Sequence, residues 1–359
     1  MYCDFCSFVS RNEDERAEYV RSLCREIAER GTKDYIVDTV YFGGGTPSLL
    51  SVAQMDEILS TVRENFVLAE NVEITLECNP MTHLEDGLQY FADIRRLGVN
   101  RLSMGVQSAN DNELKLIGRR HTFAEAKNTF WMARESGFEN ISLDLMFGIP
   151  SQTMESLKKS VSELVALYPE HISIYSLQLE EGTPLYKMQD KYCFADDDTV
   201  ADMYESVVAL MRENGYSHYE ISNYARDDRE SRHNNKYWQL DEYIGLGLAA
   251  HSDFDGKRIE NTSKMQDYLD GAWMLSSKEV SEKEREIEFL MLGLRTKKGI
   301  SKNTFFERFG FSFDEKYGKK VEQIKKMGYL EQIDDRVALT EQGFEISNSI
   351  LAELLDFDY

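Results

Sequence analysis

Short apolar runs recur along the first two-thirds of the chain at intervals of about 30 residues, the length of one strand-plus-helix unit. Segments with apolar residues at helical spacing lie between these runs, as in residues 51–66 and 153–167. This alternation predicts a parallel sheet or barrel covered by helices. The expected strands are residues 39–42, 72–77, 101–106, 141–146 and 172–177.

The pattern changes beyond residue 182. A helix is expected over 199–214, followed by a segment rich in aromatic residues and histidine over 216–251. The polar stretch 252–264 predicts a surface loop or a boundary. The remainder predicts helices and a short hairpin in the order of a winged helix. We therefore divide the chain into a partial barrel over 1–215, a middle segment over 216–280 and a winged-helix-like domain over 281–359.

The chain carries 64 acidic and 41 basic residues, a formal net charge of -23. This charge argues against nucleic acid as a partner, against a DNA-binding role for the winged-helix-like domain, and against an anionic membrane surface. No apolar stretch of about 18 residues indicates an integral membrane segment, and the first residues lack a secretory signal pattern. Five cysteines, an odd number, argue against a disulfide scaffold, so we expect a cytoplasmic protein.

Glycine-rich and polar motifs follow the expected strands, where chemistry gathers in parallel α/β folds. Each motif alone is compatible with ordinary turn structure. Together they predict one mouth that suits a small zwitterionic ligand with hydroxyl groups. There, Glu77 can accept hydrogen bonds from hydroxyl or ammonium groups. The motifs are GGGTP at 43–47, ECNP at 77–80, GVQS at 105–108, GIP at 148–150 and QLEEGTP at 178–184.

Other ligand-binding fingerprints fail. The sequence has no G-x-x-x-x-G-K-[ST] motif and no H-E-x-x-H motif, which excludes a P-loop and a zincin site. Residues 245–250, GLGLAA, fit G-x-G-x-x-A, but the polar stretch after them lacks the helix and second strand of a dinucleotide-binding unit. We therefore expect no dinucleotide site there.

Two of the cysteines stand at metal-ligand spacing. Cys3 and Cys6 form a C-x-x-C pair, which supplies too few ligands for a metal site by itself. Cys24 lies on the apolar side of an expected helix and is predicted to be a core residue. Cys78 follows Glu77 in a strand, so alternation sends their side chains to opposite faces.

Eight motifs occur in a fixed order: GGGTP, ECNP, SMGVQS, LIGRRHT, SLDLMFGIPSQT, SIYSLQLEEGTP, HYEISNYA and SRHNNKYW. Over essentially the whole chain they resemble the radical S-adenosylmethionine (SAM) proteins related to oxygen-independent coproporphyrinogen III oxidase, and most closely the haem chaperone branch. The resemblance implies an incomplete parallel (β/α)6 barrel with a [4Fe–4S] cluster and SAM. In the family, a C-x-x-x-C-x-x-C loop supplies three cluster ligands, and SAM binds the open iron.

The resemblance also implies site residues. Cys3 matches the last cluster cysteine, whereas Cys6 is extra relative to the family pattern and is only a weak metal candidate. Arg119 is expected on the helix after its strand, and no catalytic residue is assigned. The positions that match SAM contacts are Gly43, Gly44, Gly45, Thr46, Glu77, Gln107, Arg119 and Asp144.

The sequence departs from the family at its beginning. The family has a strand and two cysteines before the position that matches Cys3, and neither is present here. The two other cluster ligands are therefore expected before Met1, in an N-terminally truncated gene product whose upstream DNA encodes them together with the missing strand. A sheet without that strand has an open edge.

Two features favour the haem chaperone over the oxidase. Phe5 stands where the resemblance places a fourth cysteine in the oxidase. Residues 232–238, RHNNKYW, match the H-N-x-x-Y-W motif of the chaperone branch. His233 is a candidate haem ligand, and Tyr237 and Trp238 can stack on a porphyrin. The alternative is a histidine that fixes a loop beside core aromatic residues.

Three functions follow from these observations. The main prediction is a haem chaperone that binds haem and passes it to acceptor proteins, which the sequence does not identify. The second is a radical SAM enzyme that decarboxylates coproporphyrinogen III, so enzymatic activity stays open. The third, which requires the N-terminus to be genuine, is an interaction protein without a cluster.

Overall fold

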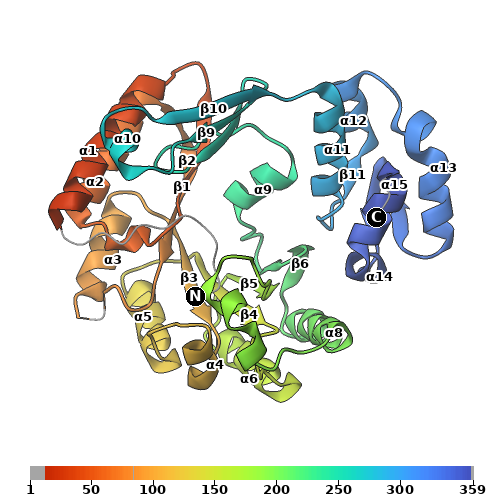
Figure 1. Ribbon diagram of the computed structural model, residues 1–359, viewed down its shortest axis with the longest axis horizontal. Helices are drawn as coiled ribbons and strands as arrows, with labels where there is room; N and C mark the ends of the chain where they lie inside the picture. The colour runs from red at the N-terminus through yellow and green to blue at the C-terminus, as the bar shows by residue number, and fades with distance from the viewer. Residues whose placement is uncertain (1–12, 84, 357–359) are drawn as a thin grey trace.

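The computed structural model describes residues 13–83 and 85–356. Its central element is a curled seven-stranded sheet in the order β1–β2–β3–β4–β5–β7–β6 (Figure 1). Strands β1 to β5 run parallel, and β7 and β6 are antiparallel. The predicted parallel half-barrel is therefore confirmed. The strands are β1 (Ile36–Phe42), β2 (Val67–Cys78), β3 (Arg101–Gln107), β4 (Ile141–Phe147), β5 (His171–Ser176), β6 (Ser217–Glu220) and β7 (Asn223–Ala225).

Helices follow the parallel strands and cover the outside of the sheet (Figure 1). Leu102, Leu143 and Ile172 of the strands are buried in one apolar cluster with Phe130 and Leu164 of the helices. Burial of such side chains is the main favourable contribution to folding. The helices are α1 (Glu13–Arg30), α2 (Val52–Asn65), α3 (Gly87–Arg96), α4 (Asp111–Leu116), α5 (Phe123–Glu135), α6 (Met154–Val165), α7 (Pro184–Lys187) and α8 (Asp197–Glu213).

The inner face of the sheet is polar. Along β3, Leu102 and Met104 enter the apolar cluster, while Arg101, Ser103 and Gln107 alternate with them and belong to the other face. Strand register continues this polar face across the sheet. One row consists of Glu77, Ser103, Ser142 and His171 on four successive strands.

The polar stretch 252–264 is folded, so its prediction as a surface loop or boundary is wrong. It contributes β8 (His251–Phe254) and β9 (Lys257–Asn261), which pair with β10 (Met274–Glu279) in a second sheet. Asp253 is 2% exposed there and forms ion pairs with Arg258 and Arg285. Because the buried side chains of this segment are polar and paired, it lacks the apolar alternation of an ordinary strand.

The C-terminal region has its own apolar core, which includes Leu290, Phe305, Val321 and Leu351. Figure 1 shows its helices (blue) grouped at one end of the molecule. The predicted helices and hairpin are present. No helix among residues 13–83 and 85–356 is long and apolar enough to span a membrane. The elements are α11 (Glu282–Gly293), β11 (Ile300–Ser301), α12 (Lys302–Phe309), α13 (Phe313–Lys326), β12 (Leu330–Ile333), β13 (Arg336–Leu339), α14 (Glu341–Glu345) and α15 (Ser347–Leu355).

A buried carboxylate joins the second sheet to α1. Glu26 is fully buried and accepts hydrogen bonds from the amide of Gly247 at 2.8 Å, from Nδ2 of Asn261 at 2.7 Å and from the hydroxyl of Tyr268 at 2.7 Å. It also pairs with Arg30 at 2.9 Å. Tyr268 lies on α10 (Met265–Leu269). Gly247, in the GLGLAA segment, therefore helps to hold α1 in place through its hydrogen bond to Glu26.

We expect Glu26→Ala to lower the free energy of unfolding by about 3 kcal/mol, because it leaves buried donors without their acceptor. Urea unfolding measures the loss. The control is Glu29→Ala, which removes an exposed carboxylate from the same helix and should change stability by less than about 0.5 kcal/mol. Equal losses in the two variants would contradict the role of Glu26.

Candidate functional site

An exposed glycine loop lies above Glu77. Residues 43–46 follow β1, and the amide of Gly44 donates to Glu77 Oε2 at 3.2 Å. The hydroxyl of Tyr41 donates to Glu77 Oε1 at 2.9 Å. Gly44 has φ of 105°, and a Cβ there would meet no atom within 4 Å. At Gly43, a Cβ would lie 2.7 Å from the Tyr41 ring, so glycine is required for this close approach.

Gln107, Arg119 and Asp144 gather around Gly105. Gly105 is paired in register with Asp144 of the next strand. A Cβ on Gly105 would lie 2.9 Å from Nε2 of Gln107 and 3.5 Å from Nη2 of Arg119. The register shifts here, and Gln107 has φ of 71° while its Oε1 accepts from the Tyr175 hydroxyl at 2.7 Å. The irregular strand end thus directs the side-chain amide of Gln107 toward Gly105 and Tyr175.

Arg119 lies beyond α4, so its prediction as a helical residue is wrong. The helix ends at Leu116, and Gly118 follows with φ of 77°. A glycine in the left-handed region commonly ends a helix because it has no Cβ to clash. Arg119 therefore begins the connection to α5.

Burial shapes the electrostatics of the two carboxylates. It raises the pKa of Glu77 to about 7, opposed by the hydrogen bond from Tyr41 and reinforced by the charge of Asp144. Burial also raises the pKa of Asp144 to about 6, opposed chiefly by the charge of Arg101. Ser103 Oγ donates to Asp144 at 3.3 Å.

Two carboxylate acceptors next to amide and guanidinium donors match a ligand with an ammonium group, hydroxyl groups and a carboxylate. The side chains beside the glycine loop and around Gly105 thus fit the chemistry of SAM. The match lies in the kinds of hydrogen-bonding group present. Glu77 and Asp144 supply acceptors, and Gln107 and Arg119 supply donors.

The H-N-x-x-Y-W motif forms α9 (Arg232–Trp238), which lies against the inner face of the sheet. His233 Nδ1 is 2.9 Å from Thr39 Oγ1, and its Nε2 is 3.0 Å from the Tyr237 hydroxyl. Burial, reinforced by the positive charge of Arg101, lowers the pKa of His233 to about 4. The imidazole is therefore neutral, with both nitrogens hydrogen-bonded within the chain.

Sequence reasoning missed two residues that connect these parts. The Tyr41 ring stacks on His233 with 4.8 Å between ring centroids, while its hydroxyl binds Glu77. Glu73 accepts from the backbone amides of Arg232 at 3.3 Å and His233 at 3.1 Å. The alternation of side chains along a strand could have indicated both residues. It places Tyr41 on the same strand face as Thr39, and Glu73 on the same strand face as Glu77.

The expected cluster region lies outside the described residues. Met1, Cys3, Phe5 and Cys6 all belong to the first twelve positions, so the structure does not place them. The expectation that two further cluster ligands precede Met1 therefore stays a prediction. Within residues 13–83 and 85–356, no group of three or more His, Cys, Asp or Glu side chains is arranged to hold a metal ion.

The structure places two other cysteines for which the sequence makes a prediction. Cys78 is buried at the end of β2, and burial raises the pKa of its thiol to about 12. Cys24 is half-buried and packs against the margin of an apolar cluster, so it is less buried than the predicted core residue. Neither thiol therefore has the character of a metal ligand.

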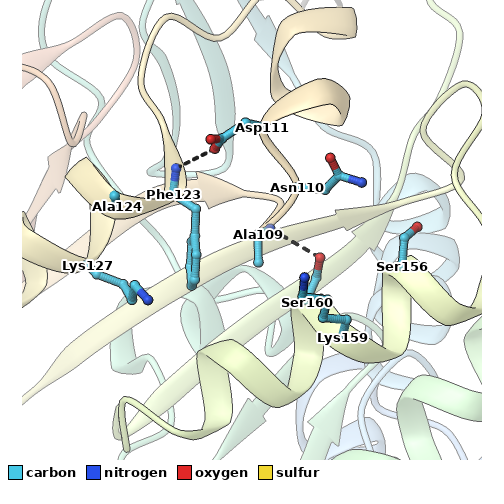
Figure 2. Close-up of a pocket in the computed structure, with 9 residues that line it drawn as sticks. All are labelled: Ala109, Asn110, Asp111, Phe123, Ala124, Lys127, Ser156, Lys159 and Ser160. Carbon is cyan, nitrogen blue, oxygen red and sulfur yellow. Dashed lines mark hydrogen bonds between the residues drawn. The ribbon is translucent and has the colours of Figure 1, made fainter.

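A cavity of about 410 Å³ lies away from these residues, beside α5 and α6 (Figure 2). Its polar groups serve the fold, because Ser160 Oγ accepts from the amide of Ala109 at 3.1 Å and Asp111 accepts from the amide of Phe123 at 2.8 Å. None of the expected site residues lines it. The lining residues are Ala109, Asn110, Asp111, Phe123, Ala124, Lys127, Ser156, Lys159 and Ser160.

Comparison with known sequences identifies two family matches. The Radical SAM superfamily matches residues 1–164, and the HemN C-terminal domain matches residues 280–346. Heme chaperone HemW of Lactococcus lactis subsp. lactis (strain IL1403) is 34% identical over 359 residues, which cover 99% of this chain and 93% of that protein. Heme chaperone HemW of Bacillus subtilis (strain 168) is 35% identical over 366 residues, which cover 99% and 95%.

Comparison with solved structures gives the same fold. Coproporphyrinogen III oxidase (HemN) from Escherichia coli, a radical SAM enzyme, matches with a TM-score of 0.84. The match covers 99% of this chain and 87% of that one at 21% sequence identity. At this identity the likeness establishes the fold alone.

The raised pKa of Glu77 predicts how stability changes with pH. The folded protein holds a proton on Glu77 that the unfolded chain releases at lower pH, so the free energy of unfolding falls as pH rises toward about 7. Because Glu77→Gln cannot ionise, its fall between about pH 5 and pH 8 should be smaller than in the wild type. Urea unfolding at both pH values measures this. Glu29→Gln, an exposed change, is the control; equal falls in wild type and Glu77→Gln would contradict the assignment.

Proposed function

The chain belongs to the heme chaperone HemW family of radical SAM proteins, and on this basis we propose that it binds haem and passes it to acceptor proteins. The observation that carries the proposal is the near full-length similarity to proteins named heme chaperone HemW. The H-N-x-x-Y-W motif adds support, because α9 is held beside the candidate SAM site.

Membership in the superfamily implies a [4Fe–4S] cluster and SAM. We assign the ammonium and hydroxyl groups of SAM to Glu77 and Asp144, and its carboxylate to Gln107 and Arg119. Residues 43–46 approach the ligand through backbone amides. Cys3 is the proposed cluster ligand within this sequence. When bound, the cluster supplies one-electron chemistry to SAM.

The two ring nitrogens of His233 have different partners, which suits a haem ligand: one nitrogen can keep its partner while the other exchanges its partner for iron. Its Nδ1 contacts Thr39 and fixes the ring, while its Nε2 contacts the hydroxyl of Tyr237, which is 38% exposed. Rotation of Tyr237 frees Nε2 for haem iron while the Thr39 contact keeps the orientation of the ring. Trp238 supplies a further aromatic side chain on the same helix.

The fold is shared with the Escherichia coli oxidase and does not separate the two activities. The names of the near full-length relatives favour the chaperone over the oxidase. Acceptor proteins are proposed as a class, and the net charge of -23 suits partners with basic surfaces. We also propose a cytoplasmic location.

Haemin titration of the purified protein tests the proposal, and a Soret band that saturates is expected. His233→Ala should weaken haem binding by more than about tenfold, because it removes a proposed iron ligand. His251→Ala is the control, since His251 is an exposed histidine on β8. Normal binding by His233→Ala would refute this ligand, and absence of a Soret band in the wild type would refute haem binding.

Protein that carries the [4Fe–4S] cluster, with the residues expected before Met1 restored, separates chaperone from oxidase. Anaerobic incubation with coproporphyrinogen III, SAM and a reductant should yield no protoporphyrinogen. Formation of that product would establish the oxidase instead.

A further inference from the structure

We propose that Tyr41 and Tyr219 are positioning residues that couple SAM binding at Glu77 and Asp144 to the position of helix α9. This inference rests on the proposed function, which places SAM at these carboxylates. It concerns two paths of contacts across the inner face of the sheet.

Polar contacts with the barrel hold the first turn of α9. No residue of the helix is fully buried, but all except Tyr237 are partly buried, so these polar contacts act together with the packing of His233 on the Tyr41 ring. The amide of Ser231 donates to the Tyr219 hydroxyl at 3.2 Å, and Ser231 Oγ caps the helix by accepting from the amide of Asn234. Glu73 accepts from the next two amides, those of Arg232 and His233. A shift in these barrel side chains therefore shifts the helix.

The first path begins at Glu77. Its Oε1 accepts from the Tyr41 hydroxyl at 2.9 Å, and the Tyr41 ring lies against His233 with an interplanar angle of 21°. A ligand that donates hydrogen bonds to Glu77 competes with Tyr41 for the same carboxylate. Movement of the Tyr41 ring then changes the surface on which His233 rests.

The second path begins at Asp144. Ser142 Oγ lies 3.5 Å from Asp144 Oδ1 and 2.7 Å from His171 Nδ1. The other nitrogen of His171, Nε2, lies 2.8 Å from the Tyr219 hydroxyl, which accepts from Ser231. His171 is fully buried, and Tyr219 is 5% exposed. The path thus runs from the proposed SAM carboxylate to the N-cap of α9.

When Asp144 is ionised, the donor and the acceptor of each hydrogen bond along this path are fixed. A carboxylate can only accept, so Ser142 donates to Asp144 and accepts from His171 Nδ1–H. Burial lowers the pKa of His171 well below its usual value, so the ring is neutral and its Nε2 accepts from the Tyr219 hydroxyl. A ligand that donates to Asp144 competes with the Ser142 hydroxyl. A shift of that hydroxyl then alters its hydrogen bond to His171, and through His171 and Tyr219 the hydrogen bond to the amide of Ser231.

Amide hydrogen exchange of residues 231–238 tests the coupling. It is measured with and without SAM, in the absence of haem, on a cluster-loaded chain to which the residues expected before Met1 have been restored. SAM should change the exchange rate of these amides by about fivefold in the wild type. Tyr41→Phe and Tyr219→Phe should each reduce the response, and the double variant should abolish it. Calorimetry with SAM establishes saturation in every variant.

Tyr216→Phe is the matched control. Tyr216 is also buried and donates its hydroxyl to the carbonyl of Pro169 at 2.7 Å, outside both paths. It should keep the wild-type response. The proposal is overturned if SAM leaves α9 unchanged in the wild type, if the double variant responds fully, or if Tyr216→Phe loses the response equally.

These measurements contain no haem. A failure of coupling is therefore distinguishable from a failure of the proposed function, which the Soret titration tests separately. Ser142→Ala provides a second variant at the other end of the Asp144 path. Combined with Tyr219→Phe it should have no further effect, because both break the same path.

Discussion

Side chains alternate between the two faces of each parallel strand, and the rest of the structure depends on this alternation. The outer face is apolar and is buried by helices. The inner face carries charged and hydroxyl side chains in aligned rows, with Arg101 only 2% exposed. Since a buried charge is costly without partners, this face must satisfy its own polar groups. The serines around Asp144 and the α9 amides bound to Glu73 are consequences of that requirement.

Arg101 shows how incompletely the requirement is met. Its Nε has no hydrogen-bond partner among the described residues. Its charge nevertheless acts on its surroundings, because it opposes the rise in the pKa of Asp144 and lowers the pKa of His171 and His233. Burial is the main reason that both imidazoles are neutral, and this guanidinium reinforces it while favouring ionisation of the carboxylate. Such arrangements are typical of functional sites, where local stability is sacrificed.

Much of the barrel could be predicted from sequence because its strands bury apolar side chains at regular spacing. β3 and β4 begin at Arg101 and Ile141, as expected. β1 and β2 begin earlier than expected, since Ile36 and Val67 at their starts are exposed. Local pattern does not reveal the strands of 252–264, because the buried Asp253 is paired with Arg258 in the same stretch and with the distant Arg285. The strand-end places of the proposed SAM residues follow from motif position, but their ligand roles stay predictions. The contacts of Tyr41 and His171 depend on register between strands, which local patterns do not encode.

No residue of α9 is fully buried, which bears on the free-energy cost of detaching this helix from the barrel. Detaching this helix exchanges internal hydrogen bonds for bonds to water, at about 1 kcal/mol each, and separates the His233 ring from Tyr41 and the Tyr237 ring from Tyr243. The barrel and the C-terminal region keep separate apolar cores that do not depend on it. We therefore expect α9 to open and reclose as a unit more readily than the elements that form either apolar core. A bulky planar molecule can in this way reach the inner face without global unfolding.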